Sequence, residues 1–162
     1  MTKTEVNFDT VLPLPTVLGQ SVRRISIERA DHQKCARITL WHEAAEGVQI
    51  WSQMHDVAER LEIGVLSFAS VSAGNVNEII SEFPRPLAPK QVWKLLIEKN
   101  GTVLESGVRF LFADACELVI LPADFPFFLS ILGNCVPVTN PRPEYDLDEY
   151  QQVKIFDSAE AR

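Results

Sequence analysis

Hydrophobic and polar positions alternate along much of this chain with the period of two that is typical of β-strands. The run ARITLW at residues 36–41 alternates strictly, which predicts a strand with one solvated face. The runs VRFLF at 108–112 and ELVIL at 117–121 are apolar almost throughout, which indicates strands buried on both faces. FPFFLSIL at 125–132 predicts a further strand that begins just after Pro126. The pattern therefore predicts a mostly antiparallel β protein whose buried centre lies in its second half.

Two parts of the chain resemble one another at an offset of about 70 residues. The first part contains VRRISIER (22–29), ARITLW and VQIW (48–51), and the second contains VWKLLIEK (92–99), VRFLF and ELVIL. Each part has the pattern of a strand, a connection and a hairpin, so the sequence predicts two pseudo-repeated β-meanders. Chance similarity between amphipathic hairpins is the alternative.

One segment has apolar residues at helical spacing and predicts a short helix near residues 76–83, capped at Asn75 and ended by Pro84. With this helix the predicted fold class is α+β, dominated by antiparallel strands. Residues 52–62 and 92–99 fit either a helix or a strand. The Asn-Gly turn that follows the second of these segments favours a strand there.

The length and composition are those of one globular domain covering residues 1–162. The chain is 46% hydrophobic, which is enough for a core without disulfide staples. Its three cysteines, Cys35, Cys116 and Cys135, form no Cys-x-x-Cys pair, so we expect free, buried thiols rather than a disulfide framework. That usage is typical of a reducing compartment. Together with the lack of a readable signal peptide, it predicts a cytoplasmic protein.

The formal net charge is −7, which argues against DNA or RNA as a partner because phosphate binding needs a basic patch. Residues 144–162 hold six acidic and two basic residues and so contribute −4 of that charge. We therefore expect an extended acidic C-terminal segment over residues 137–162. A membrane span is not expected, because the most apolar window, residues 118–138, contains Asp124 and three prolines.

Motifs of the common enzyme classes, such as glycine-rich phosphate loops or a nucleophile elbow, do not occur in the sequence. The histidines lack metal-ligand spacing, and no cysteine has a histidine partner at the sequence level. We therefore expect no catalytic residue, no metal and no cofactor. The alternative is a small-ligand-binding protein or enzyme with a pocket between the two β halves. Its candidate residues are the histidines, three carboxylates beside apolar strands and three tryptophans: His32, His42, His55, Glu98, Glu105, Glu117, Trp41, Trp51 and Trp93.

The most distinctive polar segment is PEYDLDEY at residues 143–150. Tyrosines among carboxylates combine aromatic anchors with steering charge, a mixture found at protein–protein contacts. The alternative is a solvated tail whose tyrosines and Leu147 hold it against the body of the protein. The candidate partner-binding residues are Glu144, Tyr145, Asp146, Asp148, Glu149 and Tyr150.

The run GVRFLFADACELVILPADFPFFLSI at residues 107–131, followed by PEYDLDEY, resembles the C-terminal half of small acidic bacterial proteins of the toxin-immunity type. The resemblance covers about the last third of the chain and includes no catalytic residues. It implies a non-catalytic protein that binds and neutralises a cognate toxin. The expected partner is a basic domain of that toxin.

Overall fold

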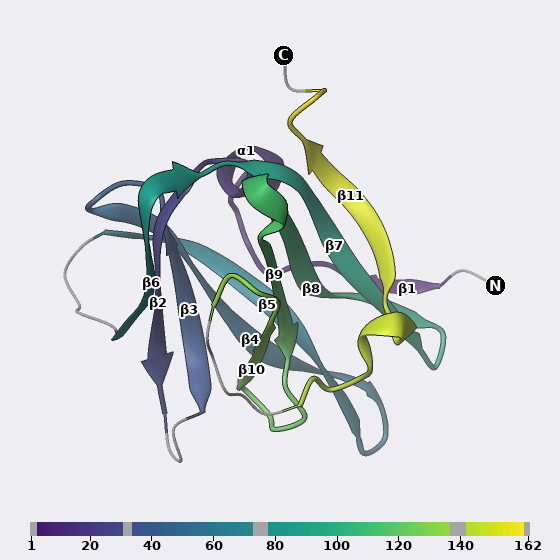
Figure 1. Ribbon diagram of the computed structural model, residues 1–162. Helices are drawn as coiled ribbons and strands as arrows, with labels where there is room; N and C mark the ends of the chain where they lie inside the picture. Colours follow the sequence, from purple (N-terminus) through teal and green to yellow (C-terminus); the bar gives the residue numbers. More distant parts are fainter. Residues whose placement is uncertain (1–2, 31–33, 73–77, 137–141, 161–162) are drawn as a thin grey trace.

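Each half of the chain forms one β-sheet, and the two sheets pack against one another (Figure 1). The computed structural model describes residues 3–30, 34–72, 78–136 and 142–160. Strands from residues 22–87 form the N-terminal sheet. Strands from residues 89–157, joined by a short strand from the start of the chain, form the C-terminal sheet. The prediction of a mostly antiparallel β protein is confirmed.

The two sheets have the same strand order. The N-terminal sheet runs β5-β4-β3-β2-β6 and the C-terminal sheet runs β10-β9-β8-β7-β11, with β1 paired in parallel to β8. Each sheet is therefore an antiparallel meander of consecutive strands whose last strand returns beside the first. The N-terminal sheet contains β2 (Val22–Arg29), β3 (Cys35–Trp41), β4 (Glu46–Ala58), β5 (Leu61–Ser72) and β6 (Glu78–Leu87). The C-terminal sheet contains β1 (Thr4–Val6), β7 (Pro89–Lys99), β8 (Thr102–Phe112), β9 (Glu117–Pro122), β10 (Leu129–Leu132) and β11 (Gln151–Asp157).

Helical structure in the described residues is limited to short elements. They are the α-helix α1 (Leu14–Leu18) and the 3₁₀ turns η2 (Ala113–Ala115) and η3 (Leu147–Glu149). None of the described helices has the length and apolar character needed to cross a membrane.

The main hydrophobic core lies between the sheets, because alternate residues of each strand point to the same face. Phe110 and Phe112 of β8 are fully buried, and their rings stack with centroids 5.6 Å apart. Members from the N-terminal sheet are Ile25, Ile27, Ile38, Leu40, Val48, Ile50, Leu66 and Phe68, and those from the C-terminal sheet include Val92, Val108, Leu118, Ile120, Leu129 and Ile131. The space between the sheets is thus filled by side chains.

A second, smaller core lies on the other face of the C-terminal sheet. Val119 and Leu121, which alternate with the main-core residues of β9, belong to it together with Tyr150. Its other members are Ile63, Val65, Leu95, Ile97 and Leu104, with Tyr145 and Leu147 packed against them. Strand β9 is therefore buried on both faces, as the sequence predicts for residues 117–121. The same prediction is wrong for residues 108–112, because Arg109 and Leu111 of β8 lie on the face opposite Phe110 and are only half-buried, and Arg109 forms an ion pair with Glu117.

The outward edge of β5 is closed by groups from distant parts of the chain. The N–H of Gly64 donates to Glu144, and its carbonyl accepts from the Ser106 hydroxyl at 2.8 Å. Further along, Asp9 N–H donates to the Leu66 carbonyl at 3.2 Å. A Cβ at Gly64 would lie 2.4 Å from the Pro122 Cβ, so only glycine permits this approach of β5 to β9. The edge joins the two sheets and leaves few free backbone groups there.

The predicted helix near residues 76–83 is wrong. Residues 78–83 belong to strand β6, and Asn75 lies outside the described residues. Strand β6 pairs with β2 at the edge of its sheet, where Pro84 and Pro86 are tolerated. Register shifts in this pairing let Ile80 and Phe83 both pack against the main core despite their helical spacing. Pairing with β2 therefore overrides the local helical pattern.

Both ambiguous segments are strands. Residues 52–62 span the β4–β5 hairpin, and residues 92–99 lie in β7. The strand predicted at residues 125–132 begins only at Leu129, because residues 125–128 form a turn.

The expectation of three free thiols is wrong for two of them. Cys116 and Cys135 form a disulfide, while Cys35 is free and buried. A hairpin between β9 and β10 brings the pair together, which no local spacing motif announces.

Candidate functional site

The predicted partner-binding segment, residues 143–150, starts beside the end of β9 and leads into β11. Pro143 forms an isolated bridge with Ala123, and Glu144 N–H donates to the Pro122 carbonyl at 2.9 Å. The segment therefore lies against the body of the protein at its first residues, and it does not extend away as a free tail.

Glu144 points inward and bonds to the edge of β5, at the junction of the two sheets. We call this junction the seam. Its carboxylate accepts the Gly64 N–H at 3.1 Å and 3.3 Å from its two oxygens. Burial raises the pKa of this carboxyl to about 7, and the Gly64 hydrogen bond opposes that rise only in part. Glu144 is thus a structural group, although the sequence pattern assigns it to the partner-binding surface.

Tyr145 and Tyr150 anchor the segment. Their rings meet edge to face at 6.5 Å, and Tyr150 is only 5% exposed within the second core. The Lys99 ammonium lies 4.4 Å from the Tyr145 ring centroid. Burial, followed by the charge of nearby Glu144, raises the pKa of the Tyr150 hydroxyl, which stays neutral. These contacts match the alternative in which the tyrosines hold the segment in place.

The remaining three candidates are exposed and form what we call the acidic turn: Asp146, Asp148 and Glu149 around η3. The Glu149 carboxylate accepts the Asp146 N–H at 3.0 Å, and Glu149 N–H donates to the Asp146 carbonyl at 2.9 Å. Lys99 forms an ion pair with Glu149 at 3.6 Å. The carboxylates of the acidic turn are therefore presented to solvent on a fixed backbone.

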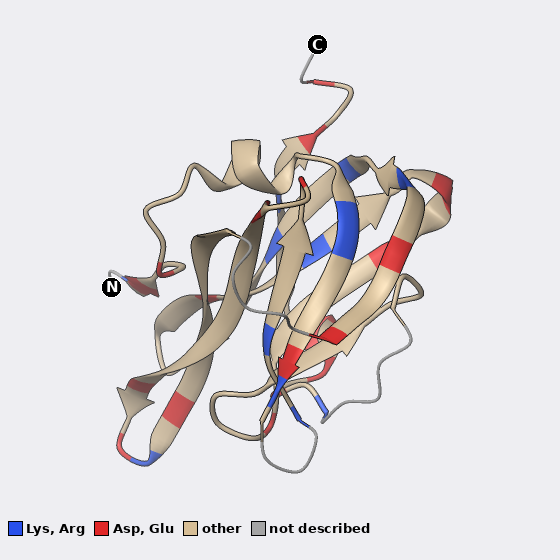
Figure 2. Cartoon of the chain, turned by 90° about the vertical axis from the view of Figure 1, so that its left-hand side faces the viewer, with Lys and Arg blue, Asp and Glu red and all other residues tan. Residues whose placement is uncertain are grey.

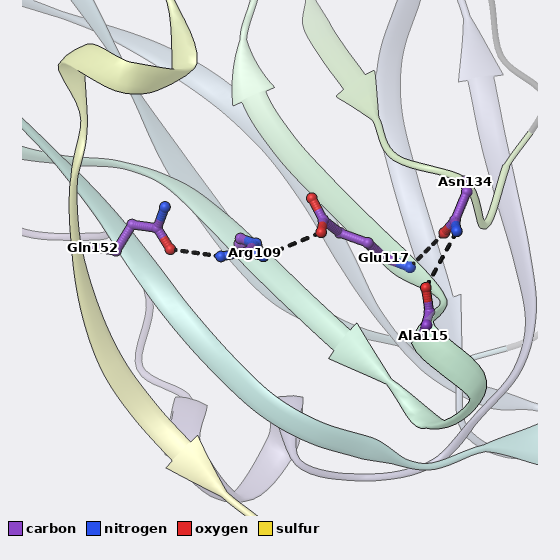
Figure 3. A network of polar contacts seen from close by, with 5 residues as sticks. All are labelled: Arg109, Ala115, Glu117, Asn134 and Gln152. Atoms are coloured by element: carbon purple, nitrogen blue, oxygen red, sulfur yellow. Dashed lines mark hydrogen bonds and ion pairs between the residues drawn. The ribbon is translucent and has the colours of Figure 1, made fainter.

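A chain of polar contacts holds β11 beyond the acidic turn (Figure 3). Arg109 of β8 donates to Gln152 at 2.9 Å and to Glu117 at 3.1 Å. The Glu117 N–H then donates to the side-chain oxygen of Asn134, whose amide donates to the Ala115 carbonyl at 3.2 Å. Four backbone segments are joined in this way, which fixes the sheet on which the acidic turn rests.

Next to residues 142–144 lies what we call the aromatic loop, residues 123–128. Phe125 and Phe127 are 48% and 62% exposed. Phe127 has a φ of 68°, in the left-handed region, which costs a residue with a side chain roughly 1–2 kcal/mol. The sequence pattern missed this loop, because FPFF reads as the start of a strand. The Pro126-Phe127 pair, with proline where a turn prefers it, is the signal that could have found it.

The three tryptophans do not share a pocket. Trp41 and Trp51 lie on the outer face of the N-terminal sheet, each beside the arginine opposite it in the neighbouring strand, Arg24 and Arg37. Trp93 lies on the other sheet, with Arg109 at 4.8 Å from its ring. These pairs are cross-strand contacts on sheet faces, and Trp41 is buried there, with its indole N–H donating to the Ser26 hydroxyl at 2.8 Å.

The carboxylates beside apolar strands are engaged in ion pairs. Glu98 pairs with Lys3, Glu105 with Lys94, and Glu117 with Arg109. They are spread over the C-terminal sheet and do not converge on one position. On the face shown in Figure 2, positive and negative positions are interspersed over the strands. Structural pairing accounts for these three carboxylates.

The two histidines in the described part of the chain, His42 and His55, belong to no group that could hold a metal ion. His42 donates from Nδ1 to the Ser21 carbonyl at 3.0 Å, since a carbonyl can only accept. His55 lies further along β4, and His32 is outside the described residues. Within the described ranges, no group of three His, Cys, Asp or Glu side chains could hold a metal ion.

Surface clefts lie beside the β3–β4 turn and, with Ile155 and Phe156 in the lining, at β11. One, of about 480 Å³, is lined by Val17, Gln20, His42, Glu43, Glu46, Gly47, Ser70, Val71 and Ser72. Another, of about 230 Å³, is lined by Arg23, Arg24, Glu43, Ala44, Glu82, Phe83, Pro84 and Pro86. Polar and charged residues make up two thirds of the first lining and half of the second, in which Ala44, Phe83, Pro84 and Pro86 are apolar.

Comparison of this chain with protein families, with curated proteins and with solved structures finds no match.

Proposed function

We propose that this protein is a non-catalytic protein-binding module that acts as an immunity protein, binding and neutralising a cognate bacterial toxin. The observation that carries the proposal is the acidic turn, in which three exposed carboxylates stand on a backbone fixed on both sides. Groups that are already ordered lose little conformational entropy on binding. Fixed negative charge also speeds the approach of a basic partner. The resemblance of residues 107–150 to immunity proteins supports the same function.

The partner in this proposal is a basic toxin domain. Lys99 neutralises only part of the charge of the acidic turn, because its single positive charge pairs with Glu149 at 3.6 Å and the turn holds three carboxylates. Asp148 and Asp146 are therefore the residues that most directly offer charge to a partner. A ligand pocket between the two sheets has no comparable support, since that space is filled by the main core.

The cellular compartment of the protein can be tested through the oxidation state of Cys116 and Cys135. We propose a cytoplasmic location, in which Cys116 and Cys135 would be reduced in the cell. Trapping thiols with iodoacetamide at the moment of lysis, followed by mass spectrometry, reads this state directly. A fully oxidised pair in the trapped sample would place the protein in an oxidising compartment instead.

The test of the proposed function begins with co-purification of the tagged protein from its native host and identification of the bound protein. Affinity is then measured for the wild type and for the triple variant Asp146→Asn, Asp148→Asn, Glu149→Gln, whose amides can still accept the turn hydrogen bonds. We expect a loss of at least tenfold in affinity and a weaker salt dependence of the association rate.

The matched control neutralises three exposed acids at the far end of β3: Glu43→Gln, Glu46→Gln and Glu82→Gln. Its net charge equals that of the triple variant, so it separates a local effect from a general one. Equal affinity of both variants would remove the acidic turn from the binding surface, and the lack of any specific partner would overturn the proposed function.

A further inference from the structure

We propose that the aromatic loop, residues 123–128, is the hydrophobic anchor for a protein partner that offers an apolar pocket bordered by basic side chains. This inference rests on the proposed binding function and names a second part of the same surface. It is carried by the conformation of Phe127, by the exposure of two phenylalanines in one turn and by the position of the loop beside the acidic turn.

The conformation of the loop is unfavourable for the residue it contains. Phe128 N–H donates to the Phe125 carbonyl at 3.3 Å, which closes a four-residue turn with Pro126 second and Phe127 third. A φ of 68° at the third position is the geometry of a type II turn, where glycine is preferred. Phe127 is also 62% exposed, so burial offsets little of this strain. Strain of this kind points to a function for the side chain outside the folding of the chain itself.

Exposed aromatic surface is concentrated in this turn. Among the described residues, the large hydrophobic side chains that are exposed are Val11, Ile79, Phe125 and Phe127. Two of them therefore lie within three consecutive positions. The Lys34 ammonium, from the neighbouring β2–β3 connection, lies 4.2 Å from the Phe125 ring. Rigid aromatic side chains are the groups that most often dominate the energy of a protein interface.

The loop is held in place by its neighbours. Ala123 N–H donates to the Phe128 carbonyl at 2.9 Å, which closes the base of the loop. Asp124 N–H donates to the Arg142 carbonyl at 2.9 Å. The rings are therefore presented on a fixed backbone, which lowers the entropy lost when a partner orders them.

The position of the loop indicates the chemistry of the partner. Pro143 bridges to Ala123, and Asp146 follows three residues later, so the two Cα atoms of Pro143 and Asp146 are at most about 11 Å apart. This separation is short enough for one interface of ordinary size, roughly 800 Å² on each partner, to reach both features. The phenylalanines require an apolar pocket, and the carboxylates of the acidic turn require basic groups at its border.

A second copy of this chain fits these requirements poorly. The cleft beside its β3–β4 turn has apolar residues and two arginines, but Glu43 and Glu82 line it as well and would repel the acidic turn. Each copy also has a net charge of −7, which disfavours self-association. An anionic membrane surface would repel the acidic turn. Self-association and vesicle binding are therefore the competing outcomes of the test.

The experiment places the photoreactive residue p-benzoyl-phenylalanine at position 127, at position 125 and, as a control, at position 79 on β6. The native host cells are irradiated and adducts are identified by mass. We expect the same protein adduct at 125 and 127 and none at 79. An adduct of twice the mass of the chain, a lipid adduct, or no adduct would overturn the inference.

Affinity for the identified partner is then compared for Phe127→Gly, Phe127→Asn and the control Ile79→Ser. Glycine and asparagine tolerate the left-handed conformation, so both variants keep the turn. We expect each to raise the thermal midpoint by roughly 2–4 °C and to lower affinity at least tenfold, while Ile79→Ser leaves affinity unchanged. A partner that depends on the acidic turn but binds both Phe127 variants normally would overturn the anchor and leave the proposed function standing.

Discussion

The Glu144 carboxylate accepts the backbone N–H of Gly64, a residue 80 positions earlier in the chain, at 3.1 Å and 3.3 Å. This contact fastens the C-terminal acidic segment to the edge of β5, and it places a carboxyl group in a site where burial raises its pKa to about 7. The seam between the two sheets therefore contains a group that titrates near neutral pH.

Stability should depend on pH through Glu144. Its pKa is about 7 in the folded protein and near 4.5 when unfolded, so its contribution is fully present below pH 4.5 and is lost as pH rises through 7. We expect the free energy of unfolding of the wild type to fall over this window relative to that of Glu144→Gln. Urea unfolding of both proteins at several pH values measures the difference. A constant difference from pH 4 to pH 8 would show that Glu144 is not buried in this way.

Crowding at Gly64 gives a second expectation. A Cβ there would meet Pro122 at 2.4 Å and the Ser52 hydroxyl at 2.8 Å, so Gly64→Ala should cost about 2–3 kcal/mol of unfolding free energy. Gly101→Ala is the control, because its Cβ meets nothing within 4 Å and only its φ of 75° is unfavourable, which costs about 1 kcal/mol. Chemical denaturation ranks the two variants. A smaller loss for Gly64→Ala would contradict the close approach of β5 to β9.

Thiol labelling should separate the three cysteines of the purified, oxidised protein. Cys35 is 2% exposed, and burial raises the pKa of its thiol to about 12, so the folded protein should not react with iodoacetamide. Unfolding without reductant should expose one reactive thiol, and unfolding with reductant should expose three. Intact mass spectrometry counts the labels. Three labels in the unfolded, unreduced sample would disprove the Cys116–Cys135 disulfide.

Asn134 should contribute more to stability than its exposure suggests. Its side chain accepts from Glu117 N–H and donates to the Ala115 carbonyl, so Asn134→Ala should cost about 1–2 kcal/mol. Gln152→Ala, at the other end of the same network, removes one exposed hydrogen bond and should cost less than about 0.5 kcal/mol. Thermal unfolding measures the loss of stability in the two variants. Equal losses would argue that Asn134 does not stabilise the contact between the start of β9 and the end of β10.

The strands were predictable because their information is local. The alternation at residues 36–41 and the continuous apolar runs at 108–112 and 117–121 correspond to β3, β8 and β9. Burial on both faces is confirmed for β9 but not for β8, where Arg109 is half-buried, and the predicted solvated face of β3 holds the buried Thr39 and Trp41. The helix prediction near residues 76–83 failed because the pairing of β6 with β2 depends on residues about 50 positions away. Register shifts in that pairing allow Ile80 and Phe83, which have helical spacing in the sequence, both to pack against the main core.

The candidate site was predictable only in part, for a similar reason. Segment 143–150 stands out by composition, but composition does not separate Glu144 and Tyr150, which face inward, from Asp148, which faces solvent. The inward position of Glu144 depends on Gly64, whose N–H it accepts and whose missing side chain lets β5 approach Pro122. The aromatic loop was missed because Phe127 occupies a turn position that favours glycine, and local sequence rules do not anticipate such exceptions.

The common strand order of the two sheets has a kinetic consequence. In each half, neighbouring strands of the meander can pair through short hairpins. In contrast, β6 and β11 must each pair with a strand that lies far earlier in the sequence, β2 and β7. Closing such long loops is slow, and it comes after the local hairpins have formed. The acidic turn, one of the two parts of the surface assigned to the partner, directly precedes β11 in the chain. It would therefore take shape at the last stage of folding, when the final strand docks.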